Sequence, residues 1–297
     1  MQSRVKNAQI WQKSRPLVKC TVSWKTAQKV LIKKAGRWSQ AYLNERNVAV
    51  SGQQSTFNLY QHIGVPTEPL IVVEIAPDCV ITAAHSMSPS FSLGHGYPGK
   101  TILIRNYGDI LGCGGQGGQG GSGLAGTHGG DGEQGGTALK VSEAQCRVII
   151  ENFGRIGGGS GGGGGGSALY VGSNVARSQY VGTAGTRGSD GFGDIAPEPS
   201  RAQCRHWGNA SGWSSWFVVG AFQDGVKAHY FKGGRGGVGA SAGANGAANE
   251  VVPIPIYSGF FFHVYQPGRG GRAGYAIDGI SKAQLTHAGT LSGAQVN

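Results

Sequence analysis

The sequence has little charge and no long apolar run. Charged residues make up 14% and hydrophobic residues 39% of its 297 positions, a balance that argues against an ordinary enzyme-sized globule with one large aliphatic core. A membrane-spanning helix needs about 18 consecutive apolar residues, and the chain contains no such run. The stretch Met1–Ser14 also lacks the apolar segment of a secretory signal. We therefore expect a soluble protein that is not exported through the Sec pathway.

Cysteine, proline and acidic residues are also scarce. The cysteines are odd in number and widely spaced, without a Cys-x-x-Cys pair or a histidine at ligand spacing, so we expect no metal, no cofactor and no disulfide framework. Mostly reduced thiols fit assembly in a cytoplasm. The long glycine runs contain no proline, which excludes a collagen triple helix. The five cysteines are Cys20, Cys79, Cys113, Cys146 and Cys204.

The positive charge is concentrated at the N-terminus. Residues 1–46 carry eleven Lys and Arg residues against Glu45 alone, a net charge of +10, whereas the other 251 residues carry +1. This pattern predicts a basic attachment region, residues 1–50, followed by a near-neutral body. Charge alone would suit nucleic acid, but Trp11, Trp24 and Trp38 are interleaved with the basic residues. We favour docking to another protein through these tryptophans.

Short phrases recur along the body of the chain. Three of them come directly after stretches in which apolar residues alternate with other residues. Each predicts a strand, a glycine turn and a second short strand. A β-rich connecting domain is expected at residues 51–100, with strands near Leu70–Ile75 and Cys79–Ile81. Almost nothing in the sequence predicts a helix. The three phrases are Asn106–Gly112, Asn152–Gly158 and His287–Gly293.

Glycine is abundant, with 56 residues, and its tracts have a period of three. A threefold left-handed helix places every third residue in one row and leaves the other two rows bare. Such helices lack internal hydrogen bonds, so bare rows favour a lattice in which neighbouring helices bond to one another. The alternative is a flexible Gly/Ser linker. The best rows are Cys113, Gln116, Gln119 and Ser122, then His128, Asp131, Gln134 and Thr137.

The candidate catalytic motifs are weak. Val80–His85 resembles the histidine segment of chymotrypsin-like serine proteases and Asp131 could serve as its acid, but no Gly-Asp-Ser-Gly-Gly nucleophile segment exists. No phosphate-binding Gly-x-x-x-x-Gly-Lys motif occurs either. Arg-Gly-Gly steps at Arg235 and Arg269 leave open a structural or RNA-associated Gly-rich protein as the second interpretation. A serine hydrolase is a distant third, and we expect no enzyme.

The repeated phrases, the Gly-Gly-x rows and the closure Gly274–Ile277 resemble the receptor-recognition adhesins that cap the long tail fibres of T-even-like bacteriophages. They are also similar to the Gly-rich C-terminal domains of siphophage tail fibre proteins. The likeness covers roughly residues 57–297. It implies a polyglycine II sandwich, whose end loops contact a receptor.

The resemblance completes the expected organisation. The fold class is mostly irregular and β: a small β-containing N-terminal attachment region, then a polyglycine II sandwich with short framing strands and long loops in a receptor-binding domain at residues 101–297. The implied partners are a phage tail or fibre protein and a bacterial outer-membrane protein or surface glycan, and nucleic acid is not among them. The implied location is the tail of the virion. The protein is expected to form a homotrimer as one possible assembly. Rigidly held aromatic side chains suit receptor contact. The chosen residues are Tyr180, Phe192, Trp207, Trp213 and Trp216.

Overall fold

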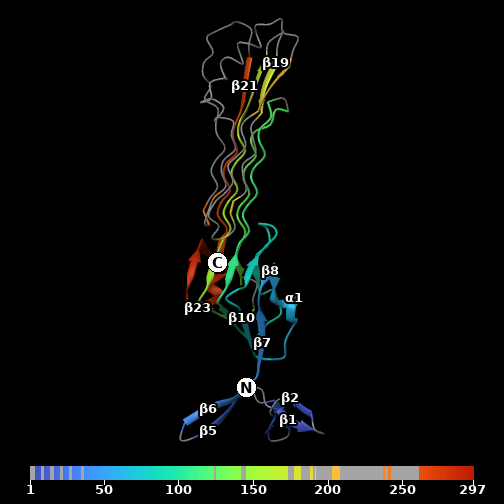
Figure 1. The fold of residues 1–297 in the computed structure, drawn as a ribbon, viewed down its shortest axis with the longest axis vertical. Helices are drawn as coiled ribbons and strands as arrows, with labels where there is room; N and C mark the ends of the chain where they lie inside the picture. Colours follow the sequence, from blue (N-terminus) through green and yellow to red (C-terminus); the bar gives the residue numbers. More distant parts are fainter. Residues whose placement is uncertain are drawn as a thin grey trace.

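The protein is elongated in this computed structural model. N-terminal hairpins lie at one end, a β-structure lies in the middle, and a shaft of extended glycine segments leads to a four-stranded sheet at the other end (Figure 1). The structure describes residues 41–123, 125–141, 145–172, 177–181, 188–189, 191, 203–207, 237, 240–241 and 261–297, together with the strands within residues 4–40. The fold is mostly β, as predicted: the described helices are α1 (Leu59–Ile63) and the single 3-10 turn η2 (Ile280–Lys282).

Six N-terminal strands form three antiparallel hairpins. In each hairpin the paired strands are separated by two residues in the sequence, the commonest spacing for an antiparallel pair of consecutive strands. The hairpins are β1 (Arg4–Asn7) with β2 (Ile10–Lys13), β3 (Leu17–Cys20) with β4 (Ser23–Thr26), and β5 (Lys29–Lys34) with β6 (Arg37–Leu43).

The middle of the protein is a three-sided parallel β-solenoid. The chain visits three sheets in turn and repeats this circuit, here called a coil, five times. The first sheet contains β7 (Glu45–Val50), β10 (Leu70–Ile75), β13 (Thr101–Asn106), β16 (Arg147–Asn152) and β23 (Ala283–His287). The second contains β8 (Gln53–Ser55), β11 (Val80–Thr82), β14 (Asp109–Leu111), β17 (Arg155–Gly157) and β24 (Thr290–Ser292). The third contains β9 (Phe57–Asn58), β12 (Phe91–Ser92), β15 (Leu139–Lys140), β22 (Tyr275–Asp278) and β25 (Ala294–Val296).

Aliphatic side chains fill the interior of the solenoid. In β13, Ile102 and Ile104 are fully buried while the residues between them are partly exposed, the period of two expected for a strand with one buried face. Register neighbours from successive coils stack on each other, as Ile71, Ile102 and Val148 do. Burial of these stacks, at about 25 cal/mol per Å² of apolar surface, is the main source of solenoid stability.

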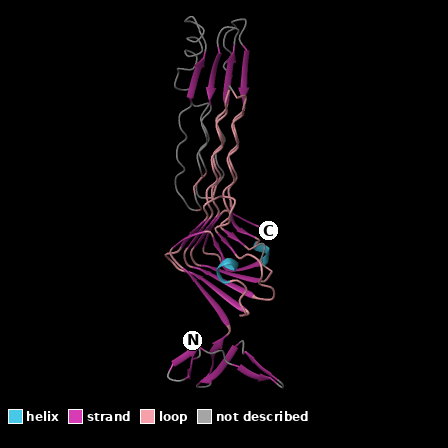
Figure 2. Cartoon of the chain, turned by 90° about the vertical axis from the view of Figure 1, so that its right-hand side faces the viewer, coloured by secondary structure: helices cyan, strands magenta, loops and turns pink. Residues whose placement is uncertain are grey.

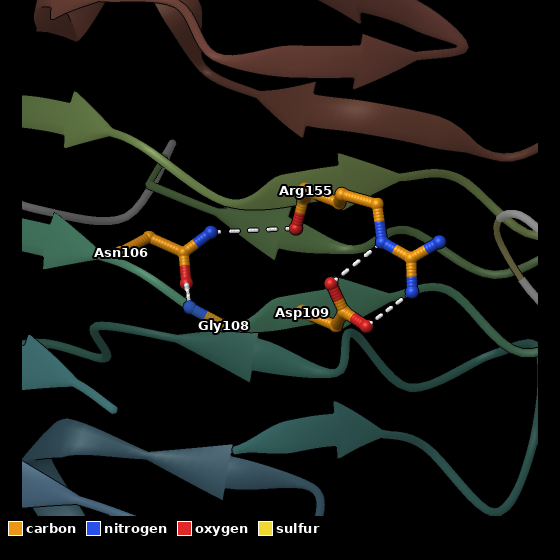
Figure 3. Close-up of polar contacts among 4 residues, drawn as sticks. All are labelled: Asn106, Gly108, Asp109 and Arg155. Atoms are coloured by element: carbon orange, nitrogen blue, oxygen red, sulfur yellow. Dashed lines mark hydrogen bonds and ion pairs between the residues drawn. The ribbon is translucent and has the colours of Figure 1, made fainter. Parts of the chain in front are cut away.

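The Asn-x-Gly phrase forms the corner between the first and second sheets. The strands predicted on both sides of it are present in all three copies. The phrase requires glycine because the preceding coil passes very close: a Cβ atom on Gly154 would lie 2.0 Å from the carbonyl oxygen of Gly108. It requires asparagine because the buried Asn106 Nδ2 donates to Asn152 Oδ1 at 2.7 Å, while Asn106 Oδ1 accepts the Gly108 N–H at 3.2 Å (Figure 3).

We expect Asn152→Ala to lower the free energy of unfolding by about 2–4 kcal/mol, because it removes buried hydrogen bonds and leaves their partners unpaired. Asn152 Nδ2 donates to the Ala288 carbonyl at 2.6 Å in addition to its bond with Asn106. Urea unfolding monitored by circular dichroism would measure the change. The matched control is Asn47→Ala, which removes an exposed asparagine of β7. Equal losses in the two variants would contradict the structural role of the asparagine stack.

Two excursions leave the solenoid at the corner between the second and third sheets. The first joins β14 to β15 and the second joins β17 to β22. Their described glycine-rich stretches are called segment one (residues 112–121), segment two (129–136), segment three (157–166) and segment four (266–274). The segments run side by side as the shaft (Figure 2).

Hydrogen bonds join the segments at every third residue. Segment one donates to segment three at 2.7 to 2.9 Å, and segment four donates to segment three with the same step. The side chains of the rows at Gln116, Gln119, His128, Asp131 and Gln134 are exposed, as the period predicts. Cys113 is an exception because it is buried at the base of the shaft. The bonds exclude a flexible linker for these segments. The donors are Gly112, Gly115, Gly118 and Gly121 in segment one, and Gly268, Gly271 and Gly274 in segment four.

Segment three lies at the centre of the shaft. All its residues are buried, and segments one, two and four all bond to it. This position explains why residues 157–166 are almost pure glycine: neighbouring backbones leave no room for side chains. Its one side chain, Ser160, finds polar partners, since its Oγ accepts the Ala240 N–H at 3.1 Å and lies 3.2 Å from Ser189 Oγ.

The sheet at the far end of the shaft is antiparallel. Its strands are β18 (Ala168–Gly172), β19 (Arg177–Val181), β20 (Gln203–Trp207) and β21 (Phe261–Tyr265), in the order β20-β19-β18-β21. The sequence analysis missed the first three because their polar and aromatic residues show no clear alternation. Strand β21 lies at one edge of this sheet, next to β18.

The structure divides the chain differently from the sequence analysis. Strand β10 pairs with β13 along its whole length, so the boundary expected near residue 100 separates two adjacent coils of one solenoid. The glycine tracts leave and rejoin that solenoid, and the strands that were expected to frame the tracts belong to its coils. The reason is that parallel pairing joins residues far apart in the sequence, which local patterns do not reveal.

Candidate receptor and attachment sites

The sheet that contains Tyr180 and Trp207 lies at the end of the protein opposite the N-terminal hairpins (Figure 1). In the distal sheet, Tyr180 lies in β19, between Leu169 and Cys204 in register, and Trp207 ends β20 opposite Arg177. Three further residues predicted for receptor contact lie outside the described part of the chain. They are Phe192, Trp213 and Trp216.

An aromatic cluster marks the junction between the shaft and the distal sheet. Tyr265, at the end of β21, contacts the rings of both His128 and His263, with centroid distances of 5.7 and 4.9 Å. His128 Nδ1 accepts the backbone N–H of Gln266 at 2.8 Å. This bond ties the imidazole of His128 to the backbone at the end of β21. The contacts fix the start of segment four against segment two.

Row side chains of segment two continue this fixation along the shaft. Asp131 Oδ1 accepts the Arg269 N–H at 2.7 Å, and Gln134 Nε2 donates to the Ala273 carbonyl at 3.2 Å. These side-chain bonds add to the backbone bonds by which segment two donates to segment four.

The N-terminal hairpins share one register near their connected ends, and the third shifts register farther away, between Val30 and Leu31. In each hairpin a lysine pairs with a tryptophan one position before the turn, as Lys6 with Trp11, Lys19 with Trp24, and Lys33 with Trp38. Cross-strand partners lie on the same face of a hairpin. The three hairpins therefore present the same pair of residue types three times. A Lys-x-x-x-x-Trp repeat in the sequence could have revealed this arrangement.

A ladder of exposed rings follows the first solenoid corner. Tyr107 stacks on Phe153 with a centroid distance of 5.1 Å and an interplanar angle of 10°, and Phe153 lies 4.3 Å from the ring of His287. Tyr107 and Phe153 directly follow the corner asparagines of their coils, whereas His287 stands in the place of the asparagine in the third phrase and pairs with Glu151 after a register shift. The sequence analysis described these phrases but did not single out their rings.

Ion pairs reinforce neighbouring coils beside this ladder. Arg155 forms a two-pronged pair with Asp109, with its Nε donating to Oδ1 at 2.7 Å (Figure 3). Arg105 donates from Nε to Glu151 Oε2 at 2.8 Å. This hydrogen bond to the Glu151 carboxylate raises the pKa of Arg105 above its usual value. Such partly exposed pairs contribute modestly to stability, about 1 kcal/mol or less each, and serve mainly to fix coil register.

A tyrosine is buried without a hydrogen bond in the solenoid core. Tyr97 has no exposed surface, and its hydroxyl finds no partner among the described residues. Burial, with smaller contributions from Cys146 and Tyr60, raises the pKa of Tyr97 above its ordinary value. Burial likewise raises the pKa of the Cys146 thiol. These groups resist ionisation in the folded protein.

We expect Tyr97→Phe to keep the fold and to increase the free energy of unfolding by up to about 1 kcal/mol at neutral pH, because an unpaired buried hydroxyl is removed. The gain should be larger above about pH 10. There the unfolded tyrosine ionises while the folded one keeps its proton, so wild-type stability falls as pH rises. Urea unfolding at neutral and alkaline pH tests this, with Tyr60→Phe at a 43% exposed position as the control. A destabilised Tyr97→Phe variant would contradict it.

The described residues do not come together as a catalytic or metal site. His85 lies exposed in the loop after β11, while Asp131 is bonded to a backbone amide of the shaft. No group of three or more His, Cys, Asp or Glu side chains gathers in a way that could hold a metal ion in the described ranges. Among these residues no helix has the length and apolarity to cross a bilayer.

The sequence model of one protein family matches most of the chain. That family is described as phage tail fibre adhesin Gp38, and the match covers residues 44–296, which is the solenoid with both of its excursions. The chain belongs to this adhesin family. The adhesin is therefore a tail component of a phage virion and a binding protein, not an enzyme, in agreement with the sequence analysis.

Comparison with solved structures gives a match to one described as the crystal structure of the gp37-gp38 adhesin tip complex of the bacteriophage S16 long tail fiber. The two chains share 19% sequence identity and a TM-score of 0.45, over 84% of the adhesin and 82% of the other chain. A search of curated proteins gave no match.

Proposed function

We propose that the adhesin is the receptor-binding protein at the tip of a phage tail or tail fibre and that it recognises a bacterial outer-membrane protein or surface glycan. The observation that carries this proposal is the family match over residues 44–296. The separation of the distal sheet from the N-terminal hairpins supports it, because one end is then free for the host while the other holds the virion (Figure 1).

We further propose that the glycine segments are polyglycine II helices and that they act as a rigid spacer. The three-residue step of their hydrogen bonds supports a threefold helix. Their close approach supports it too, since a Cβ atom on Gly118 would lie 1.9 Å from the Gly130 carbonyl oxygen. At about 3.1 Å per residue, segment three would hold the distal sheet about 30 Å from the solenoid.

The receptor contacts are proposed to come from aromatic side chains at the distal end. These residues are Tyr180, Phe192, Trp207, Trp213 and Trp216. Strand β20 carries Trp207 to the end of the sheet away from the shaft, whereas Tyr180 in β19 lies level with Leu169 and Val264, beside the junction cluster. Tryptophan and tyrosine lose little conformational entropy on binding and supply a large contact area.

Attachment to the tail is proposed to occur through Trp11, Trp24 and Trp38, with a phage tail or fibre protein as the partner. Three hairpins with the same register suit a partner that offers the same docking surface three times, as a threefold fibre end does. One adhesin chain could then occupy such an end. A homotrimeric adhesin is the other arrangement, and the mass of the assembled complex in solution distinguishes the two.

Cell binding by the purified adhesin tests receptor recognition. We expect the wild-type protein to bind susceptible cells and block phage adsorption, and Trp207→Ala to weaken both by at least about tenfold, as loss of an interface hot spot does. Trp38→Ala, at the opposite end, is the matched control and should bind cells normally. Cell binding that is unchanged by Trp207→Ala and by Ala substitutions at the other four distal aromatics would refute the proposed contacts. Binding that follows added RNA in place of cells would refute the adhesin role.

A further inference from the structure

A groove lies where both excursions return to the solenoid. Its volume is about 380 Å³, within the usual range of small-ligand sites. Three coils contribute to it: the second through the loop between β11 and β12, the third through residues 133–137, and the fourth through Tyr275 at the start of β22. The groove is remote from the distal sheet.

Glu133 in this groove breaks the glycine pattern of segment two. The row residues Asp131 and Gln134 follow the period of three, and Glu133 occupies a position that is glycine one step before and one step after. Its backbone takes part in the shaft: the Glu133 N–H donates to the Gln116 carbonyl at 2.8 Å, and the Glu133 carbonyl accepts the Gly162 N–H at 2.9 Å. A glycine would make both of these bonds, and the carboxylate adds one of its own, because Glu133 Oε2 also accepts the Gln116 N–H at 3.5 Å.

One oxygen of the Glu133 carboxylate is hydrogen-bonded, and the other remains able to accept a hydrogen bond from a ligand. Ser86 Oγ donates to Glu133 Oε2 at 3.1 Å, while Glu133 Oε1 accepts no bond within the described ranges. The hydroxyls of Thr137 and Tyr275, which line the same groove, likewise have no hydrogen-bond partner in the described part of the structure. Polar groups with no hydrogen-bond partner among the described residues thus line one hollow that solvent can enter.

An exposed methionine forms the rim of the groove. The side chain of Met87 is 94% exposed, so it contributes little to packing within this chain. Its loop is nevertheless ordered, because the Ser88 N–H donates to the His85 carbonyl at 3.1 Å and the Ser90 N–H donates to the Thr137 carbonyl at 3.0 Å. The fold therefore holds an apolar side chain in solvent beside a carboxylate.

We propose that this groove binds a hexose unit of a bacterial surface glycan. Sugar hydroxyls would donate to Glu133 and exchange hydrogen bonds with Thr137 and Tyr275, while the apolar face of the ring packs on Met87 and Tyr275. The negative charge of Glu133 favours neutral or amino sugars over acidic ones. The inference rests on the proposed function for the source of the glycan, and it places a second host contact at the base of the shaft.

Saturation-transfer NMR on the purified full-length adhesin tests the proposal with free D-glucose, D-galactose and D-glucosamine as probes. We expect saturable binding of at least one of them in the millimolar range, which corresponds to about 4 kcal/mol. Glu133→Gln, which preserves shape, and Met87→Ala, at an exposed position, should each weaken binding at least about fivefold. The control Gln119→Ala changes an exposed row residue of segment one and should bind as the wild type does.

The absence of saturable binding to all three sugars would overturn the proposal, and so would binding that survives both groove substitutions. Thermal unfolding of each variant confirms that it is folded. Because the probes are free sugars and the readout involves no cell, failure of this experiment leaves the cell-binding result of Trp207→Ala unaffected. The sugar-binding groove and the receptor contacts at the distal end are therefore tested independently.

Discussion

Gly162→Ala is expected to disrupt the shaft and to lower the melting temperature by about 10 °C or more. Gly162 lies in central segment three, where an added Cβ atom would be 1.9 Å from the Gln116 carbonyl oxygen and 2.4 Å from its carbon. Both atoms belong to backbone that is itself hydrogen-bonded, so neither can move without separating neighbouring segments. Overpacking of a rigid interior costs about 1–3 kcal/mol in ordinary cores and more where relaxation is blocked.

The matched control for this substitution is Gly130→Ala in segment two. A Cβ atom there would lie 3.1 Å from the Gln119 amide nitrogen and farther from everything else, so a shift of a few tenths of an ångström accommodates it. Differential scanning calorimetry should show a small change for Gly130→Ala and a large one for Gly162→Ala. Similar melting temperatures for both variants would mean that segment three is not the packed centre of the shaft.

Simultaneous replacement of Trp11, Trp24 and Trp38 by alanine is expected to abolish attachment to the phage fibre. Buried tryptophans at interfaces are frequent hot spots, each contributing about 2 kcal/mol or more, so the loss of three would weaken the complex by about 6 kcal/mol, or a factor of roughly 10⁴. Phage carrying the triple variant should lack the adhesin on immunoblots of purified virions and should fail to adsorb. The solenoid begins after the hairpins, so the purified variant should keep its melting temperature.

Single substitutions separate attachment from receptor binding. If the hairpins act as equivalent units, Trp11→Ala, Trp24→Ala and Trp38→Ala should each weaken binding to the fibre by a similar factor, because their registers are the same. Trp207→Ala should leave incorporation into virions intact. Normal virion content of the triple variant would refute attachment through these tryptophans and direct attention to other surfaces of the protein.

Local features of the fold could be predicted from the sequence because they arise from local chemistry. Alternation in Thr101–Ile104 and in Arg147–Ile150 marks strands, and the three-residue rows mark the exposed edge of segments one and two. The joining of coils could not be predicted, since Ile71 and Val148 come together through parallel pairing across β13. Segment three is nearly pure glycine, and its central place follows only from its neighbours.

In the candidate sites, too, the residue types were predictable from the sequence, whereas their arrangement in space was not. The tryptophans at Trp11, Trp24 and Trp38 stand out by residue type, yet their shared position beside the hairpin turns depends on register. Glu133 was visible as an irregularity in the glycine pattern, but its groove forms only when three coils bring Ser86, Thr137 and Tyr275 together. A residue type can suggest chemistry, whereas a site requires knowledge of long-range contacts.

The three-residue step of the shaft has a consequence for how such proteins change over time. Each segment bonds to its neighbours at matched positions, so an insertion in one segment preserves the bonding if it adds a multiple of three residues and if adjacent segments gain the same number. Spacer length should therefore diverge in increments of about 9 Å, through coordinated indels at sites far apart in the gene. Phages that need a longer reach would gain it more readily by exchanging whole excursions than by accumulating single codons.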